Sequence, residues 1–376
     1  MQDNTKRTWA EISLNNIRKN YETIRAGLPK ETRFLGVVKA DSYGHGALRT
    51  ALMLQEAGAD YLAVACLDEA VELRRGGVQL PILILGQTPA RYTRDLIDWN
   101  ITQATGCFAD AYAYSEEALR LGGTLKIHIK VDSGMSRVGF LGTGDSFDKS
   151  VFDIIESCSL PGLQVEGIFT HFAVSDCEGE SNEEYTRAQY KTFTDVIKAV
   201  EERGGIHFQI RHCANSGATL SYKEFALDMV RPGIILYGFE GGSKLDLQPC
   251  MRLMTRICAV KEYAPGTTVS YGRRFTAQRP TRMGVIPIGY ADGLHRAMSN
   301  KVSFAVEGKK APQCGSICMD MCMIDITDIP EADVGSEVEI FGRENSIYEL
   351  ADAAGTISYE LLCAVSKRVP RVYKDF

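Results

Sequence analysis

Apolar runs with the character of buried β-strands recur at intervals of roughly 20 to 30 residues through the first two-thirds of the chain. Between them, apolar residues return at steps of three and four, as in LNNIRKNYETIRAGL and EYTRAQYKTFTDVIKAVEERGG, which is typical of amphipathic helices. Strands that alternate with helices predict a parallel sheet, and eight such units predict a (β/α)8 barrel of the α/β class over residues 10–240. A doubly wound sheet is the alternative, because periodicity counts strands without showing that the sheet closes. The strand-like runs cover residues 34–40, 61–66, 81–86, 102–107, 125–132, 164–172, 207–215 and 233–238.

The texture of the sequence changes after residue 240. Segments such as RICAVKEYAPGTTVSYG, RMGVIPIGYADG, KVSFAVEGKKAPQ and SEVEIFG are short and rich in β-branched residues, and Gly, Pro and charged turns separate them. They predict a C-terminal all-β domain over residues 241–376. The length of 376 residues agrees with two domains, since it exceeds what one hydrophobic core usually organises.

Charge and composition exclude several classes of function. A formal net charge of −6 gives no electrostatic footprint for nucleic acid. The chain has no apolar run of 18 residues that could span a bilayer, and its first residues, MQDNTKRTWAE, lack the apolar segment of a signal peptide. We therefore expect a cytoplasmic protein with neither a nucleic-acid nor a membrane partner.

Eleven cysteines raise the question of disulfides or a metal. In a chain of this length without a secretory signal, buried thiols are the expected reading. Cys314, Cys318 and Cys322 stand four residues apart in CGSICMDMCMIDIT, where the alternation predicts a strand with all three side chains on one face. Because neither a CxxC pair nor a histidine stands nearby, we expect no metal site.

Polar side chains follow several of the predicted barrel strands, at the end where barrel active sites form. Lys39 comes directly after the first apolar run. A lysine in a barrel mouth is partly desolvated, which lowers its pKa and favours imine formation, whereas a lone lysine is more often a surface residue. The later strand ends carry Lys130, Arg137, His171, His212, Ser216 and Arg231.

Two of these strand ends suit a phosphate group. The turn Asn215-Ser216-Gly217 offers a hydroxyl and backbone N–H groups where a helix should begin, and Gly233-Ile234 allows close approach of the backbone. Each signal alone also fits an ordinary loop. A lysine together with a phosphate cradle in a barrel points to pyridoxal 5'-phosphate (PLP), whose aldehyde requires an amine.

Nine segments, spread in order over nearly the whole chain, resemble the PLP-dependent alanine racemase family. They are VVKADSYGHG, KVDSGMSRVGF, THFAVSD, HCANSGATL, MVRPGIILYG, VSYGRRF, PIGYADG, ICMDMCMIDI and SKRVPRVY. The resemblance implies a barrel followed by a β-domain that residues 1–9 join. It also implies a head-to-tail homodimer in which the partner's β-domain completes each active site. The implied reaction interconverts L- and D-alanine and supplies D-alanine for peptidoglycan.

The resemblance also assigns roles to residues. Lys39 matches the Schiff-base lysine, which is also the base serving the D-enantiomer, and Tyr271 matches the opposing base, contributed by the other subunit. Two bases agree with the chemistry, since inversion removes a proton from one face and returns one to the other. Arg231 matches the arginine on the pyridine nitrogen, and His171 the histidine against the pyridine ring. Arg137 matches the arginine near the cofactor phenolate and the substrate carboxylate, and Lys130 a lysine that is often carbamylated.

Further matches concern the phosphate and the substrate. The implied phosphate ligands are Tyr43, Ser216, Gly233 and Ile234. From the partner, Met319 and Asp320 match residues that flank the substrate, and Tyr290 in GYADG matches a tyrosine at the entrance to the site. Taken alone, GYADG could equally be a plain turn.

Two positions depart from the family's pattern. Lys367 stands where a tyrosine commonly reaches the phosphate, and a lysine contacts phosphate only as a point charge. Ser316 stands where an arginine is common, which changes the access channel or the dimer contacts. Because serine racemases of the glycopeptide-resistance type also depart at the position of Lys367, a preference for serine or another small amino acid is the alternative.

Two other classes of protein fit parts of the pattern. A barrel PLP decarboxylase shares the two-domain layout, but the context of Arg231 and the segment VSYG disfavour it. A non-catalytic PLP-binding protein on a lone barrel is disfavoured by the β-domain and Tyr271.

Overall fold

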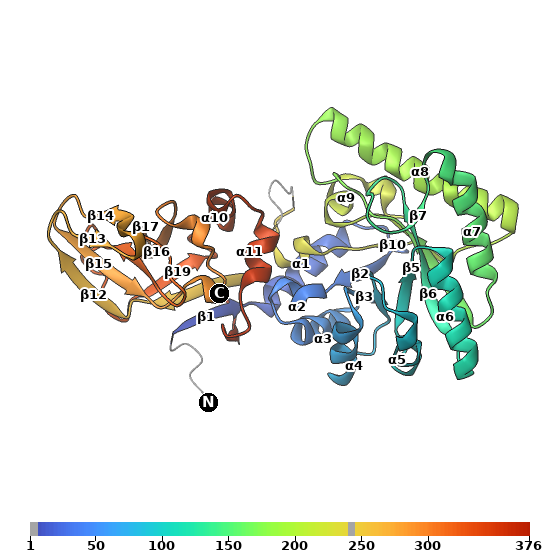
Figure 1. The fold of residues 1–376 in the computed structure, drawn as a ribbon, viewed down its shortest axis with the longest axis horizontal. Helices are drawn as coiled ribbons and strands as arrows, with labels where there is room; N and C mark the ends of the chain where they lie inside the picture. The colour runs from blue at the N-terminus through green and yellow to red at the C-terminus, as the bar shows by residue number, and fades with distance from the viewer. Residues whose placement is uncertain (1–6, 240–244) are drawn as a thin grey trace.

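The computed structural model describes residues 7–239 and 245–376, which form an α/β barrel and a β-rich body joined side by side (Figure 1). The barrel strands pair in parallel in the order β10-β2-β3-β4-β5-β6-β8-β9, without the reversal of order that a doubly wound sheet requires. Between the two end strands, the N–H groups of Asp228 and Arg231 donate to the carbonyls of Arg211 and Ala214 at 3.1 and 2.9 Å, so the barrel is nearly closed. The strands are β2 (Arg33–Val37), β3 (Tyr61–Val64), β4 (Ile82–Ile84), β5 (Thr102–Thr105), β6 (Leu125–Asp132), β8 (Leu163–Phe169), β9 (Ile210–His212) and β10 (Met229–Val230), and the short β7 (Phe140–Leu141) pairs with β6.

Amphipathic helices cover the outside of the barrel strands. In α8 (Glu180–Gly204), Phe193, Val196, Ile197 and Val200 are buried, and the helix stops at the left-handed Gly205, with φ of 65°. This is the stop that the Gly pair predicts. The other barrel helices are α1 (Leu14–Ala26), α3 (Ala47–Ala57), α4 (Leu67–Arg75), α5 (Thr93–Asp98), α6 (Phe108–Leu121), α7 (Phe147–Ser159) and the short α9 (Ser216–Ser221).

The eighth strand is not where the apolar run at 233–238 predicts it. That run forms a buried 3-10 helix, η4 (Ile234–Tyr237), and the strand is the two-residue β10 just before it. Pro232 lacks the N–H that a strand would need, and Gly233 turns the chain with φ of −118° and ψ of −95°. A short apolar run that is buried on all sides does not distinguish a strand from a helical turn.

The β-rich body contains the strands predicted after residue 240. Its sheet runs in the order β12-β15-β18-β17-β16-β19-β11-β1-β20, antiparallel except where β1 and β20 pair. The pattern did not single out two helices in this body, α10 (Ile347–Ala354) and α11 (Ser358–Ala364). The sheet strands are β1 (Thr8–Ile12), β11 (Met251–Arg256), β12 (Ala259–Tyr263), β15 (Thr281–Ile286), β16 (Ser303–Val306), β17 (Lys309–Cys314), β18 (Cys322–Asp325), β19 (Glu337–Phe341) and β20 (Arg371–Tyr373), and β13 (Thr268–Val269) pairs with β14 (Phe275–Thr276).

The single strand predicted for the three clustered cysteines is wrong. Cys314 ends β17 and Cys322 begins β18, while Cys318 lies in the loop that joins these two antiparallel strands. The Gly315 backbone, with φ of 80°, starts the loop, so the alternation of apolar residues crosses a turn. All eleven cysteines are free thiols.

The two ends of the chain meet in the β-rich sheet. Of residues 1–9, the structure describes only 7–9, and Thr8 and Trp9 start β1, which lies between β11 and β20. The expected boundary between residues 240 and 241 lies outside the described residues. Figure 1 shows α11 at the junction, between the β-rich sheet and the barrel.

Candidate active site

The turn that follows β2 winds in the left-handed sense. Ala40, Asp41, Ser42 and Tyr43 have φ between 52° and 54°, and Gly44 follows with φ of 83°. L-residues avoid this region, at a cost of roughly 1–2 kcal/mol each, so such a run requires strong support. Because of this turn, Lys39 at its start and Tyr43 at its end both line one cavity.

Hydrogen bonds from three directions hold the turn. The Glu69 carboxylate at the start of α4 accepts from the N–H groups of Ala40 and Ala65 at 2.7 and 2.8 Å, which ties the turn to the end of β3. The Asp41 side chain accepts from the Ala47 N–H at 2.7 Å and thereby begins α3. From the β-rich body, Arg371 donates to the Gly44 carbonyl at 2.9 Å.

The cavity lies at the carboxyl ends of the barrel strands and has a volume of about 680 Å³. This is the size that a cofactor with a small substrate needs. Most of the residues expected at the cofactor therefore meet in space, although they come from five separate segments. The lining includes Lys39, Tyr43, Lys130, Arg137, His171, Asn215, Ser216, Gly217, Arg231 and Ile234.

Cations dominate the charge of this cavity. Burial lowers the pKa of Lys39, and the nearby Arg137 lowers it further. Burial also lowers the pKa of Lys130 to about 8, with help from Arg137 and Arg231. The Asp132 carboxylate already accepts from three backbone N–H groups, those of residues 134, 136 and 137, at 2.9 to 3.0 Å. A cavity with this charge favours anionic ligands.

Arg231 is buried and held in one orientation. Its guanidinium donates to the carbonyls of Thr170 and Cys213 at 2.7 and 3.0 Å, and to Nδ1 of His212 at 3.1 Å. Nδ1 of His171 lies 3.4 Å from the same guanidinium. Burial lowers the pKa of Arg231 to about 10, so it remains a cation at neutral pH.

A chain of two buried histidines continues from Arg231 into the barrel. Nε2 of His212 lies 2.9 Å from Nδ1 of His128, and burial lowers the pKa of His128 to about 3, so the ring is neutral. A guanidinium only donates, so Nδ1 of His212 accepts and its proton resides on Nε2. His128 then carries its proton on Nε2, a buried atom without a partner in the described structure. The family resemblance assigns no role to His212, and this contact with Arg231 supplies one.

Another part of the cavity wall fits a phosphate. The Ser216 hydroxyl accepts from the Gly233 N–H at 2.9 Å, and a Cβ at Gly233 would stand 2.6 Å from the Tyr43 hydroxyl. Burial raises the pKa of Tyr43, so its O–H remains a donor. With the cations described above, these donors fit the phosphate of PLP, and Lys39 is the half-buried amine that its aldehyde requires.

The remaining expected residues lie on the β-rich body and do not line this cavity. Tyr271, in η5 (Tyr271–Arg273), is 72% exposed, Met319 is 53% exposed and Tyr290, in η6 (Tyr290–Asp292), is 44% exposed. Asp320 lies beside Met319 in the same loop. One chain therefore brings together the barrel residues but leaves Tyr271, Tyr290 and Met319 exposed, while Asp320 is half-exposed and pairs with Arg368.

Both positions that depart from the family's pattern have a defined place. Lys367 lines a separate hollow with Asp41 and Arg371 rather than the cavity of Lys39. Ser316 is buried, and its hydroxyl donates to the Tyr271 carbonyl at 2.9 Å, so it supports the segment that carries Tyr271.

Sequence reasoning missed part of the cavity wall. Ile357, Tyr359 and Cys363 belong to α11 and the residue before it, and they line the cavity from the β-rich body. No spacing in ISYELLC distinguishes a wall residue from a core residue. Within residues 7–239 and 245–376, no helix is both long and apolar enough to cross a membrane, and no three His, Cys, Asp or Glu side chains gather as metal ligands would.

Known proteins resemble this chain over nearly its full length. The family models for the N-terminal and the C-terminal domain of alanine racemase match residues 12–241 and 250–373. Alanine racemase 1 of Clostridium acetobutylicum is 44% identical over 97% of this chain and 95% of its own length. The alanine racemase of Desulforamulus reducens is 45% identical, over 97% of this chain and 98% of its own length.

Solved structures agree with this relationship. The alanine racemase of Clostridium difficile 630 superposes with a TM-score of 0.91 at 39% identity, covering 98% of this chain and 96% of that one. The alanine racemase of Streptomyces coelicolor A3(2) superposes with a TM-score of 0.92 at 33% identity, covering 99% of both chains. The chain thus belongs to the alanine racemase family of isomerases.

Proposed function

We propose that this protein is a PLP-dependent racemase that interconverts L- and D-alanine with two bases, Lys39 and the Tyr271 of a second copy. The observation that carries the proposal is the position of Lys39, half-buried in a cavity that a phosphate cradle and Arg231 also line. The serine alternative has less support, because the relatives at 40–45% identity bear the name alanine racemase.

The barrel residues can hold PLP by its phosphate, its ring and its aldehyde. Tyr43, Ser216 and the backbone at Gly233–Ile234 would bind the phosphate, and Lys39 would bind the aldehyde. Bound PLP withdraws electrons from the α-carbon of an amino acid and so acidifies its α-proton. Arg231, which has only donors, would leave the pyridine nitrogen unprotonated and keep that electron withdrawal weak. His171 would lie against the ring.

The two bases have opposite tasks. Burial and the nearby Arg137 lower the pKa of Lys39, so its Nζ releases a proton more readily than an exposed lysine does. It would serve the D-enantiomer. Tyr271 Oη would serve the L-enantiomer from the opposite face, with Arg137 holding the substrate carboxylate.

We infer a second copy because the expected site residues of the β-rich body do not line the cavity of their own chain. Tyr271, Tyr290 and Met319 are exposed, Asp320 lies beside Met319, and Ile357 at the barrel mouth is 61% exposed. A head-to-tail homodimer would bring Tyr271, Tyr290, Met319 and Asp320 of one copy over the cavity of the other.

The unpaired thiols agree with a reducing compartment, so we assign the reaction to the cytoplasm, where cell fractionation would recover the protein.

Lys130 has the chemistry of a carbamylation site. Its neutral amine would attack the carbon of CO2 and release one proton, and the resulting carbamate anion would pair with Arg137 instead of repelling it. Because only the neutral amine reacts, carbamate should accumulate as the pH rises through about 8, the pKa of Lys130. After incubation with ¹³C-bicarbonate, we expect one slowly exchanging carbamate signal in the carbon NMR spectrum. The same signal in Lys130→Gln would contradict this assignment.

Replacing Tyr271 should separate the two faces of the reaction. Tyr271→Phe removes one base but leaves Lys39, so racemisation should fall by about 10²–10⁴-fold while solvent deuterium still enters D-alanine faster than L-alanine. Proton NMR of each enantiomer in D2O measures both rates. Tyr112→Phe, on the exposed face of α6, is the matched control. Equal slowing of exchange for the two enantiomers would show that Tyr271 is not a base for one face.

Hybrid dimers test whether the site is shared. Lys39→Ala and Tyr271→Phe homodimers should each be nearly inactive. In a hybrid, one site carries both lesions and the other carries neither. Random 1:1 reassembly makes half of the dimers hybrid, so about a quarter of the wild-type activity should return. Native mass spectrometry would verify that hybrids formed, and their inactivity would refute the shared site.

A further inference from the structure

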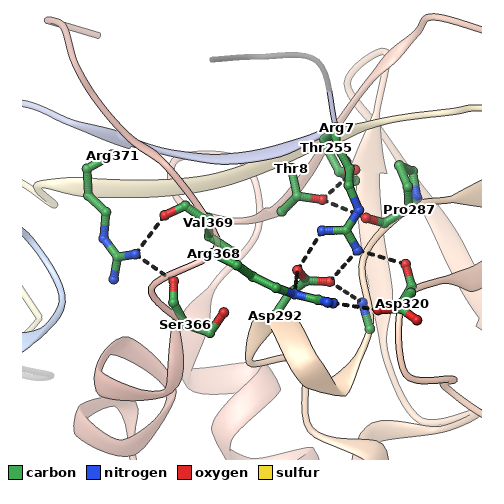
Figure 2. Close-up of polar contacts among 11 residues, drawn as sticks. Arg7, Thr8, Thr255, Pro287, Asp292, Asp320, Ser366, Arg368, Val369 and Arg371 are labelled. Carbon is green, nitrogen blue, oxygen red and sulfur yellow. Dashed lines mark hydrogen bonds and ion pairs between the residues drawn. The ribbon is translucent and has the colours of Figure 1, made fainter.

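A fully buried carboxylate, that of Asp292, lies where four segments of the β-rich body meet (Figure 2). The segments are the start of β1 with Arg7, the turn η6 with Tyr290 and Asp292, the loop with Met319 and Asp320, and the segment after α11 with Arg368. They are distant in sequence, and none of the four carries a residue that lines the cavity of Lys39 in its own chain. We call Arg7, Asp292, Asp320 and Arg368 the Asp292 cluster.

Asp292 is the centre of this cluster. Arg7 donates to both of its carboxylate oxygens, at 2.6 and 2.8 Å, and Arg368 donates to Oδ1 at 2.8 Å. The Gly289 N–H donates to Oδ2 at 2.9 Å, which joins the residue before η6 to its last residue. Burial would raise the pKa of Asp292, but the hydrogen bonds from Arg7 and Arg368 outweigh it and hold the pKa below its usual range. The carboxylate is therefore ionised and fully engaged.

The same arginines reach the loop of Met319 and Asp320. Arg368 pairs with the Asp320 carboxylate at 2.8 Å, and Arg7 donates to the Asp320 carbonyl at 2.9 Å. In Figure 2, dashed lines run from each guanidinium group to both Asp292 and Asp320. Each arginine thus joins Asp292 to Asp320, so the position of the exposed loop depends on the buried carboxylate.

Backbone contacts join η6 to this loop directly. The N–H groups of Tyr290 and Ala291 donate to the carbonyls of Cys318 and Met319, both at 3.0 Å. A Cβ at Gly289 would stand 2.3 Å from the Cys318 carbonyl oxygen, so only glycine allows this approach. The GYADG segment is therefore more than a plain turn, because its backbone N–H groups hold the loop that carries Met319.

We propose that Asp292, with Arg7 and Arg368, is a positioning residue that fixes Tyr290, Met319 and Asp320 for the active site of a second copy. This inference rests on the proposed function. None of the three residues of the cluster that do the positioning lines a cavity with Lys39. Their effect on the reaction must therefore pass through the loop and η6.

A second route of influence has to be distinguished from this one. The Ser366 N–H donates to the Asp292 carbonyl at 3.1 Å, and a Cβ at Gly293 would stand 2.3 Å from the Ala364 carbonyl oxygen. Both contacts lead to α11, whose Tyr359 and Cys363 line the cavity of the same chain. Loss of Asp292 could thus disturb its own chain's site or the partner's, and only the second outcome agrees with the proposal.

The hybrid dimer separates these routes, because its single intact site takes its barrel from the Tyr271→Phe chain and its β-rich body from the Lys39→Ala chain. Asp292→Asn is added to one chain at a time, and doubly tagged hybrids are purified with PLP bound. In the Lys39→Ala chain, we expect Asp292→Asn to raise the KM for alanine about tenfold with kcat changed by less than about threefold. In the Tyr271→Phe chain, both constants should stay within about twofold of the unmodified hybrid.

Each other outcome overturns the inference. Equal losses from both placements would show a general structural role, and a loss only from the Tyr271→Phe chain would show action through α11. A fall in kcat without a change in KM would show that the cluster does not position substrate contacts. If the hybrid without Asp292→Asn is inactive, the shared site itself fails, which distinguishes failure of the proposed function from failure of this inference.

Two further variants guard against misfolding. Arg368→Gln removes the ion pairs with Asp292 and Asp320 from a half-exposed position and leaves the carboxylate its bonds from Arg7. We expect a rise in KM of about threefold, again only from the Lys39→Ala chain. Arg279→Gln breaks the exposed pair of Arg279 with Asp328 in the same body and is the matched control, with no change from either chain. A change in KM as large for Arg279→Gln as for Arg368→Gln would contradict the proposal.

Discussion

The left-handed turn after β2 is the constraint on which the candidate site depends. Four consecutive non-glycine residues, Ala40–Tyr43, adopt a conformation that costs roughly 1–2 kcal/mol each, so the surrounding contacts must offset several kcal/mol. Those contacts come from both parts of the molecule. Glu69 supplies one from the barrel, and Arg371 and Tyr373 of β20 supply others from the β-rich body. Contacts from both the barrel and the β-rich body thus hold the turn, and Lys39 lies at its start, at the junction of the two bodies.

Electrostatics gives the junction its chemistry. Burial and the nearby Arg137 lower the pKa of Lys39 and of Lys130, while the buried Arg231 remains protonated. Such a cluster of cations is unfavourable without anions, and a phosphate with a substrate carboxylate would relieve it. The neutral His212 and His128 behind Arg231 add no charge but fix its direction. Repulsion among the cations is therefore unfavourable in the free protein, and the cavity prefers anionic ligands.

The sequence predicts the barrel and most of its mouth, because polar residues at the ends of apolar strands must converge when the strands are parallel. It does not predict the left-handed turn, since only Gly44 and Gly46 among its residues signal unusual backbone angles. The run at 233–238 and the cysteine segment mislead for the same reason. Apolar spacing reports burial, and burial is shared by strands, buried turns and hairpin loops. The role of Asp292 cannot be predicted from the sequence, because its partners, Arg7 and Arg368, lie near the two ends of the chain.

We expect the left-handed turn to present Lys39, and not Lys130, to the carbonyl group of PLP. Both amines line one cavity, and both have a lowered pKa, so charge alone does not choose between them. Borohydride reduction of the PLP-loaded protein, followed by peptide mapping with mass spectrometry, would locate the fixed cofactor. We expect a pyridoxyl group on Lys39 alone, and none in Lys39→Ala. A pyridoxyl group on Lys130, or on any lysine outside this cavity, would contradict it.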